Sequence, residues 1–184
     1  MIWFTSDTHF FHKNVIPYCS RPFKTIEEMH EAIISNWNSC VGVNDIVYHL
    51  GDFGFANGKK LADIRARLSG RIHLILGNHD DSISKRKWLE EVKVEGVYDN
   101  LDVAEFHLNH YPITGESNEV PDRFKEKRPT CTDKWILCGH IHDRWRIRDN
   151  CFNVGVDVNE FKPILLDTIR MEIKLYEQEN NASS

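Results

Sequence analysis

The chain has 184 residues, of which 41% are hydrophobic and 28% are charged, and its formal net charge is −5. A chain of this length buries a core without disulfide staples, so we expect a single domain over residues 1–184. The negative net charge argues against a large basic surface for nucleic acid, and no apolar stretch approaches the ~20 residues that cross a bilayer.

Strand-like and helix-like segments alternate through the first half of the chain. The strand-like runs are residues 1–6, 45–50 and 71–76. The helix-like segments are residues 26–40, which follow a capping box formed by Thr25 and Glu28, and residues 59–68, which Gly70 closes. This alternation predicts a parallel sheet with right-handed crossovers.

The second half of the chain is richer in strand-like runs. We expect strands over residues 102–110, 134–138, 145–148 and 152–158. Asp167 is predicted to cap a C-terminal helix, and the polar residues 179–184 are predicted to be a frayed tail.

Residues 114–133 form a long polar segment with two prolines and four basic residues between 123 and 128. Structureless segments of this length are uncommon inside a compact domain. Because the segment leaves the chain just past His110, we expect a mobile loop near the site, and a flap that grips the substrate is the weaker interpretation.

Polar motifs follow the predicted strands at the points where these strands end. They are Asp7-Thr8-His9, Gly51-Asp52, Gly77-Asn78-His79-Asp80, His110 and Gly139-His140-Ile141-His142. The carboxyl ends of parallel strands lie along one edge of a sheet, so we expect the first three motifs to converge. Imidazole, carboxylate and carboxamide groups bind borderline first-row metal ions, and these motifs hold enough of them for two ions.

Two of these residues have a more specific prediction. In the expected strand 102–110, Phe106, Leu108 and His110 follow one another at a spacing of two residues, so His110 shares the inward face of the two apolar residues. His107 is expected to face the other way. Two neighbouring dications repel one another and need a bridging anion. Asp52, the central acidic residue of the set, is predicted to be that bridge.

In order and spacing, the motifs resemble the calcineurin-like metallophosphoesterase superfamily over residues 7–142, and their flanking runs resemble a small bacterial or phage-type branch. The resemblance implies an α/β fold, a four-layer αββα sandwich of two facing mixed sheets. It implies that one metal ion is held by Asp7, His9 and His142, the other by Asn78, His110 and His140, with Asp52 bridging. His79 would protonate the leaving group, and Asp80 would orient His79.

This set of residues predicts a phosphoesterase that hydrolyses small phosphodiesters or phosphomonoesters by attack of a metal-bridging hydroxide. Mixed nitrogen and oxygen ligands favour Mn, Fe, Zn, Ni or Co, and Mn(II) is the working choice. Two other functions stay open. One is a nuclease that acts on single-stranded nucleic acid, which the basic residues between 123 and 128 favour, and the other is a non-catalytic scaffold for protein binding.

His12, Arg21 and Arg123 are weaker candidates for contacts with the substrate phosphate. For His12, a local cap of the helix after Asn14 is an equally good interpretation, and an arginine before a proline, such as Arg21, is more often structural. His49 is expected to be a buried histidine that forms hydrogen bonds.

The five cysteines are widely spaced without a Cys-x-x-Cys pair, so neither a disulfide framework nor a zinc knuckle is predicted. The opening residues lack the basic and apolar regions of a secretion signal. We therefore expect a cytoplasmic protein that acts on a small phosphate ester and does not associate with a membrane. The oligomeric state is left open.

Overall fold

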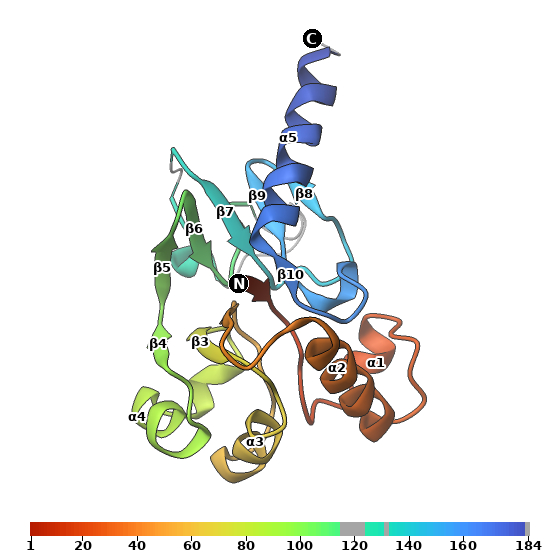
Figure 1. Ribbon diagram of the computed structural model, residues 1–184, viewed down its shortest axis with the longest axis vertical. Helices are drawn as coiled ribbons and strands as arrows, with labels where there is room; N and C mark the ends of the chain where they lie inside the picture. The colour runs from red at the N-terminus through yellow and green to blue at the C-terminus, as the bar shows by residue number, and fades with distance from the viewer. Residues whose placement is uncertain (115–123, 131–132, 183–184) are drawn as a thin grey trace.

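The computed structural model describes residues 1–114, 124–130 and 133–182, and its strands form two five-stranded sheets (Figure 1). The first sheet has the order β10-β1-β2-β3-β4, and the second has the order β5-β6-β7-β9-β8. Both sheets mix parallel and antiparallel pairs. The two mixed sheets with flanking helices confirm the predicted fold class.

The first sheet contains β1 (Ile2–Thr5), β2 (Ile46–His49), β3 (Arg71–Ile75), β4 (Gly96–Tyr98) and the antiparallel edge strand β10 (Ile164–Leu165). Strands β1 to β4 are parallel. Thr5 pairs with His49, and His49 pairs with Leu74, so the three central strands end at the same level. The loops that follow them therefore start side by side.

The second sheet contains β5 (Asn100–Val103), β6 (Phe106–Asn109), β7 (Trp135–Cys138), β8 (Ile147–Arg148) and β9 (Cys151–Asn153). Its central strands β6, β7 and β9 are parallel, and β5 and β8 join them as antiparallel hairpin partners. Strands β6 and β7 thus carry His110 and His140 out of the sheet in the same direction.

Helices pack on the outer face of the first sheet. They are α1 (Val15–Tyr18), α2 (Ile26–Cys40), α3 (Gly58–Arg65) and α4 (Lys85–Lys87), which continues into a π-helical turn over Trp88–Val92. One apolar cluster joins these helices to this face, for example through Met29 and Trp37 against Val47 and Ile72. Thr25 is the N-cap of α2 as predicted, because its hydroxyl accepts from Glu28 N–H at 3.1 Å. The predicted capping box is not complete, since the Glu28 carboxylate accepts from Lys24 N–H and not from Thr25 N–H.

A second apolar cluster fills the space between the sheets. Phe4 and Ile75 of the first sheet meet Leu108 and Leu137 of the second, and helix α5 (Leu166–Ala182) adds Ile169 to this cluster. The far face of the second sheet carries a smaller cluster around Ile136 and Cys138, which packs against loop residues. Among the described residues, no helix combines the length and the apolar character that a bilayer crossing needs.

Four details of the elements differ from the sequence-based expectation. The expected strand 102–110 is a β5–β6 hairpin that turns at Ala104, a residue with φ 51°. The expected strand 152–158 ends at Asn153 and gives way to a short 3₁₀ turn, Val156–Val158. Asp167 lies in the first turn of α5 rather than before it, and the helix continues through most of the expected frayed tail to Ala182.

Candidate metal centre

The loops after β1 and β2 run together beyond the sheet. Asp7 N–H donates to Gly51 O, and His9 N–H donates to Asp52 O, each at 3.0 Å. Left-handed backbone conformations occur at five of the predicted ligands, with φ of 58° at Asp7, 50° at His9, 55° at Asp52, 71° at His140 and 49° at His142. Such conformations cost free energy in non-glycine residues and cluster at functional sites, because the surrounding structure must hold them in place.

Asp7, His9 and His142 form the first group, and their ligand atoms all lie within 4.8 Å of one another. Asp7 is fully buried, and both of its carboxylate oxygens accept from His140 N–H, at 3.2 and 3.0 Å. The carboxylate of the first motif is thus fixed by the backbone of the last one. Residues more than 130 positions apart are joined at this point.

Asp52, His110 and His140 form the second group, again within 4.8 Å and all buried. The Nδ1 atom of His110 lies 2.7 Å from Leu50 O, a carbonyl that can only accept. His110 therefore holds its proton at Nδ1 and turns a bare Nε2 toward Asp52. This is the arrangement that a histidine ligand needs, because the hydrogen bond on one ring nitrogen leaves the other free for a metal ion.

The carboxylate of Asp52 belongs to the second group and also faces His9 of the first group. Its Oδ2 atom is 3.5 Å from His9 Nε2 and 3.6 Å from His110 Nε2, while its Oδ1 atom accepts from His79 N–H at 2.9 Å. One oxygen of Asp52 thus faces a histidine from each group. This is the geometry expected of a bridging carboxylate.

The unsatisfied polar atoms of the site fit metal ions. Among the described side chains, His9 Nε2, His110 Nε2 and Asn78 Oδ1 are buried and have no hydrogen-bond partner. Buried groups of this kind are normally satisfied, so these three atoms need an explanation, above all the two imidazole nitrogens that face the same oxygen of Asp52. Burial and the nearby carboxylate of Asp7 raise the pKa of Asp52. A cation would relieve that repulsion, and the donor set suits a first-row dication.

Two glycines allow the loops to approach one another so closely. A Cβ atom on Gly77 would overlap Oδ1 of Asp52, and a Cβ atom on Gly139 would overlap Oδ2 of Asp7 and Oγ of Ser6. The glycines of the third and last motifs therefore leave room for the two carboxylates.

His142 is oriented by a carboxylate that sequence reasoning missed. Its Nδ1 atom lies 3.0 Å from Oδ2 of Asp157, a residue beyond β9 whose side chain is buried. Burial opposes the effect, but the hydrogen bond to Asp157 raises the pKa of His142 to about 11. A proton and a metal ion compete for such an imidazole. No clear signal in the sequence pointed to this role, because Asp157 lay inside the expected strand 152–158, whereas in the structure β9 ends at Asn153.

Arg21 does not face the cleft, so its predicted contact with a substrate phosphate is wrong. The residue is only 5% exposed, and its guanidinium binds both oxygens of Asp157, at 2.7 and 2.8 Å, and the carbonyls of Asp7 and Thr8. Its donors are thereby used in holding the site together. Arg123, the other predicted basic contact, lies outside the described residues.

Asp80 also differs from its predicted role of orienting His79. Its carboxylate is fully buried and accepts from the backbone N–H groups of Asp52, Phe53 and Gly77, at 2.7, 3.1 and 2.9 Å. Among the described residues, the partners of this carboxylate are therefore backbone N–H groups rather than the His79 ring. Asp80 therefore ties the second motif to the third.

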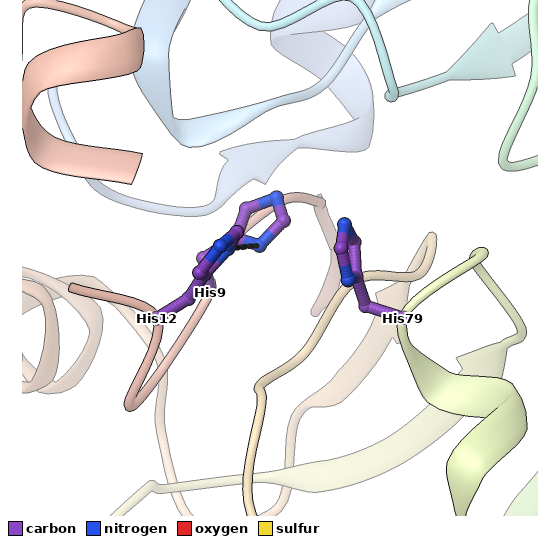
Figure 2. A group of neighbouring side chains, drawn as sticks. All are labelled: His9, His12 and His79. Carbon is purple, nitrogen blue, oxygen red and sulfur yellow. Dashed lines mark hydrogen bonds between the residues drawn. The ribbon is translucent and has the colours of Figure 1, made fainter. Parts of the chain in front are cut away.

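His79 lines a cavity beside the two groups, and Figure 2 shows its ring across from those of His9 and His12. The centroid of its ring lies 5.3 Å from that of His9, 5.1 Å from that of His12 and 5.7 Å from that of Phe55. Burial lowers the pKa of His79. A cavity of about 440 Å³ lies here, and His9, His12, His79 and His142 are among its lining residues.

The described part of the segment 114–133 packs at the edge of the second group. The ring of Phe124 lies 5.0 Å from that of His140 and stacks on Tyr111 at 5.2 Å. Lys127 Nζ lies 2.8 Å from Asp81, a residue of the turn that follows His79. Phe124 and Lys127 of this segment therefore lie next to residues of the site. The rest of the expectation falls largely on residues outside the described ranges.

Comparison with known proteins finds a matching family model, similar proteins and a similar solved structure. A family model described as calcineurin-like phosphoesterase superfamily domain matches residues 1–156. An uncharacterized protein of Methanocaldococcus jannaschii is 35% identical over 96% of this chain and 92% of its own length, and the gene 66 protein of Mycobacterium phage L5 is 28% identical over 84% and 86%. A solved structure from Aquifex aeolicus, a protein of unknown function, is 28% identical and covers 93% of this chain and 98% of its own, with a TM-score of 0.67.

Proposed function

The chain belongs to the calcineurin-like phosphoesterase superfamily, and from this premise we propose that it hydrolyses phosphate esters at a pair of divalent metal ions. The observation that carries the proposal is the position of Asp52, whose Oδ2 atom lies 3.5 and 3.6 Å from the Nε2 atoms of His9 and His110, neither of which has a hydrogen-bond partner among the described residues. A carboxylate shared by two histidines of separate groups suits two ions better than one.

In this proposal the two ions have separate ligand sets joined by Asp52. The first set is Asp7, His9 and His142, and the second is Asn78, His110 and His140. Such a metal pair, when bound, lowers the pKa of water and neutralises charge on the phosphate. The mixture of imidazole and oxygen donors favours Mn, Fe, Zn, Ni or Co, and Mn(II) is our choice for assays.

The remaining residues of the site position the ligands and handle a proton. His79, anchored by its own N–H on Asp52, lies at the mouth and is proposed to hold a proton for the departing alkoxide. Burial lowers the pKa of this imidazole, but a bound phosphate anion would act in the opposite direction. Asp80 keeps the loop that carries His79 fixed to the loop that carries Asp52.

The proposed substrates are small phosphodiesters or phosphomonoesters that fit the cavity beside His79. A single-stranded nucleic acid is a second candidate, because two exposed aromatic side chains border this region. Tyr18 lines the cavity and is 76% exposed, and Phe55, next to His12 and His79, is 56% exposed. Aromatic rings at such positions can stack on bases, although the net charge of −5 works against a long electrostatic contact.

The test is hydrolysis of bis-p-nitrophenyl phosphate, p-nitrophenyl phosphate and a single-stranded oligonucleotide by the protein with added Mn(II). We expect turnover of at least one of them, and a loss of at least about 100-fold in Asp52→Asn, because even partners of ligands contribute 10–100-fold. Asp63→Asn, an exposed carboxylate on α3, is the matched control and should retain the activity. Absence of turnover with all three substrates, or an Asp52→Asn variant as active as the control, would refute the proposal.

A further inference from the structure

His9 and His12 share an unusual hydrogen bond between two imidazole rings. Their Nδ1 atoms lie 3.1 Å apart, as the dashed line in Figure 2 marks. Each neutral imidazole has one protonated and one bare ring nitrogen, so one of these two Nδ1 atoms donates and the other accepts. The backbone supports the contact, because His12 N–H donates to His9 O at 3.0 Å and the turn passes through Phe11 with φ 65°.

The surroundings of His9 decide which nitrogen donates. Its Nε2 atom faces the carboxylates of Asp7 and Asp52 at 3.8 and 3.5 Å, is buried and has no hydrogen-bond partner. These distances are too long for a hydrogen bond but suit two ligands on either side of a cation. If Nε2 binds a metal ion, the proton of His9 is on Nδ1 and is donated to Nδ1 of His12. The proton of His12 is then on its own Nε2 atom.

We propose that His12 is a positioning residue that fixes the tautomer of His9, and that its Nε2–H is a neutral donor at the mouth of the site for a phosphoryl oxygen of the substrate. The proposal rests on the metal assignment of the proposed function. The ligand set predicted from the sequence contains no hydrogen-bond partner for Nδ1 of His9.

Two other proposed histidine ligands also have a hydrogen-bond partner at Nδ1, which leaves their Nε2 atoms for a metal ion. His110 donates to a carbonyl, Leu50 O, and His142 pairs with the carboxylate of Asp157. His9 uses a second imidazole for this purpose. Because a neutral imidazole can also donate, this partner adds a hydrogen-bond donor to the site that a carbonyl or a carboxylate would not add. The ring of His12 is 5.1 Å from that of His79, so both line the same cavity.

The first test is Mn(II) binding by titration calorimetry to the wild type, His12→Asn, His12→Ala and the control Lys13→Ala. An asparagine Oδ1 atom can accept in place of Nδ1, so we expect His12→Asn and the exposed control to bind as the wild type does. His12→Ala should bind one ion about 10–100-fold more weakly. At saturating Mn(II), His12→Asn should still lose about tenfold in kcat/KM, because the shorter asparagine amide places no donor at the position of the Nε2–H group.

The second test reads the tautomers directly. Ring ¹⁵N spectra of the Zn(II)-loaded protein should show His9 bound through Nε2, and His12 protonated at Nε2 and not bound to zinc. A His12 nitrogen that ligates zinc, a His12 protonated at Nδ1, or His12→Ala binding Mn(II) like the wild type would overturn the proposal. These readouts need no turnover. A protein that passes them but cleaves no ester refutes the proposed function alone, and an active enzyme that fails them refutes this inference alone.

Discussion

At the scale of single residues, the site depends on partners that fix each ligand. His110 is held by Leu50 O, His142 by Asp157 and Asp7 by His140 N–H. Such contacts set the direction of a ring or carboxylate, which matters as much for metal binding as the identity of the ligand. The ion pair of Arg21 and Asp157 extends this arrangement, because it also reaches the backbone carbonyls of Asp7 and Thr8.

Arg21→Ala should therefore impair both stability and metal binding. It leaves Asp157 as a buried carboxylate without its cation, which costs about 3–5 kcal/mol of unfolding free energy, and it loosens His142. Urea unfolding and Mn(II) titration measure the two effects. Arg170→Ala is the matched control, because Arg170 binds Glu105 through two hydrogen bonds but in an exposed setting, and it should change little. Equal effects of the two substitutions would contradict the role given to Arg21.

His79→Ala tests the proposed proton donor through the leaving group. For esters of simple alcohols, which leave as poor alkoxides, the loss in kcat should be about 10²–10⁴-fold. For p-nitrophenyl esters, which leave as a stable phenolate, we expect a much smaller loss. The comparison is a series of esters of increasing leaving-group pKa with the wild type and the variant. Equal losses across the series would argue against His79 as the acid.

The sequence could predict which residues gather at the site but not every contact that they form. The spacing of the motifs after strands led to Asp7, His9, Asp52, His110, His140 and His142, which the structure brings together in two groups. The phosphate contact of Arg21 and the orienting role of Asp80 could not be judged from the sequence, because their partners, Asp157 and three backbone N–H groups, are set by the meeting of distant loops. For Arg21, the alternative of a structural role is the one that the structure supports. A local pattern contains no information about such partners.

At the scale of elements, the site is a consequence of strands that end together. The register places Thr5, His49 and Leu74 in one row, so the first three motifs emerge from one edge. The alternation of strands and helices was sufficient to predict this. The β5–β6 hairpin was missed because apolar alternation continues through its turn, and the short edge strands β4 and β10 contain too few residues for a pattern.

Gly139→Ala tests how closely the last motif must approach the first. The added Cβ atom would overlap the carboxylate of Asp7, so we expect weaker Mn(II) binding and a loss of about 1–3 kcal/mol in unfolding free energy. Gly42→Ala is the control, since its Cβ atom would meet Asp45 no closer than 3.5 Å. Calorimetric titration and thermal unfolding measure both. Unchanged metal affinity in Gly139→Ala would show that the two loops do not need this contact.

At the scale of the whole molecule, the fold buries polar groups deep in the structure. His49 is an example, and its pKa differs between the folded and the unfolded protein. It is fully buried, and its Nε2 lies 2.9 Å from Thr8 Oγ1. Thr8 donates its only hydroxyl proton to Phe53 O, so His49 must donate to Thr8. The expectation of a buried histidine that forms hydrogen bonds is therefore confirmed.

Because of His49, the unfolding free energy of the metal-free protein should decrease as the pH is lowered. Burial lowers the pKa of His49 to about 3, whereas an unfolded histidine takes up a proton near 6.5. Between these values the unfolded state binds more protons, so stability is present above about pH 6.5 and is lost as the pH falls. His49→Gln should flatten the slope by up to about 1.4 kcal/mol per pH unit in this window. Urea titrations at several pH values measure it, and parallel curves for both proteins would contradict the assignment.

The most direct measurement of the central claim is anomalous diffraction from crystals of the protein grown with Mn(II). The account predicts two manganese peaks, one beside Asp7, His9 and His142 and the other beside Asn78, His110 and His140, with the carboxylate of Asp52 in contact with both. A single peak, or peaks away from Asp52, would contradict it.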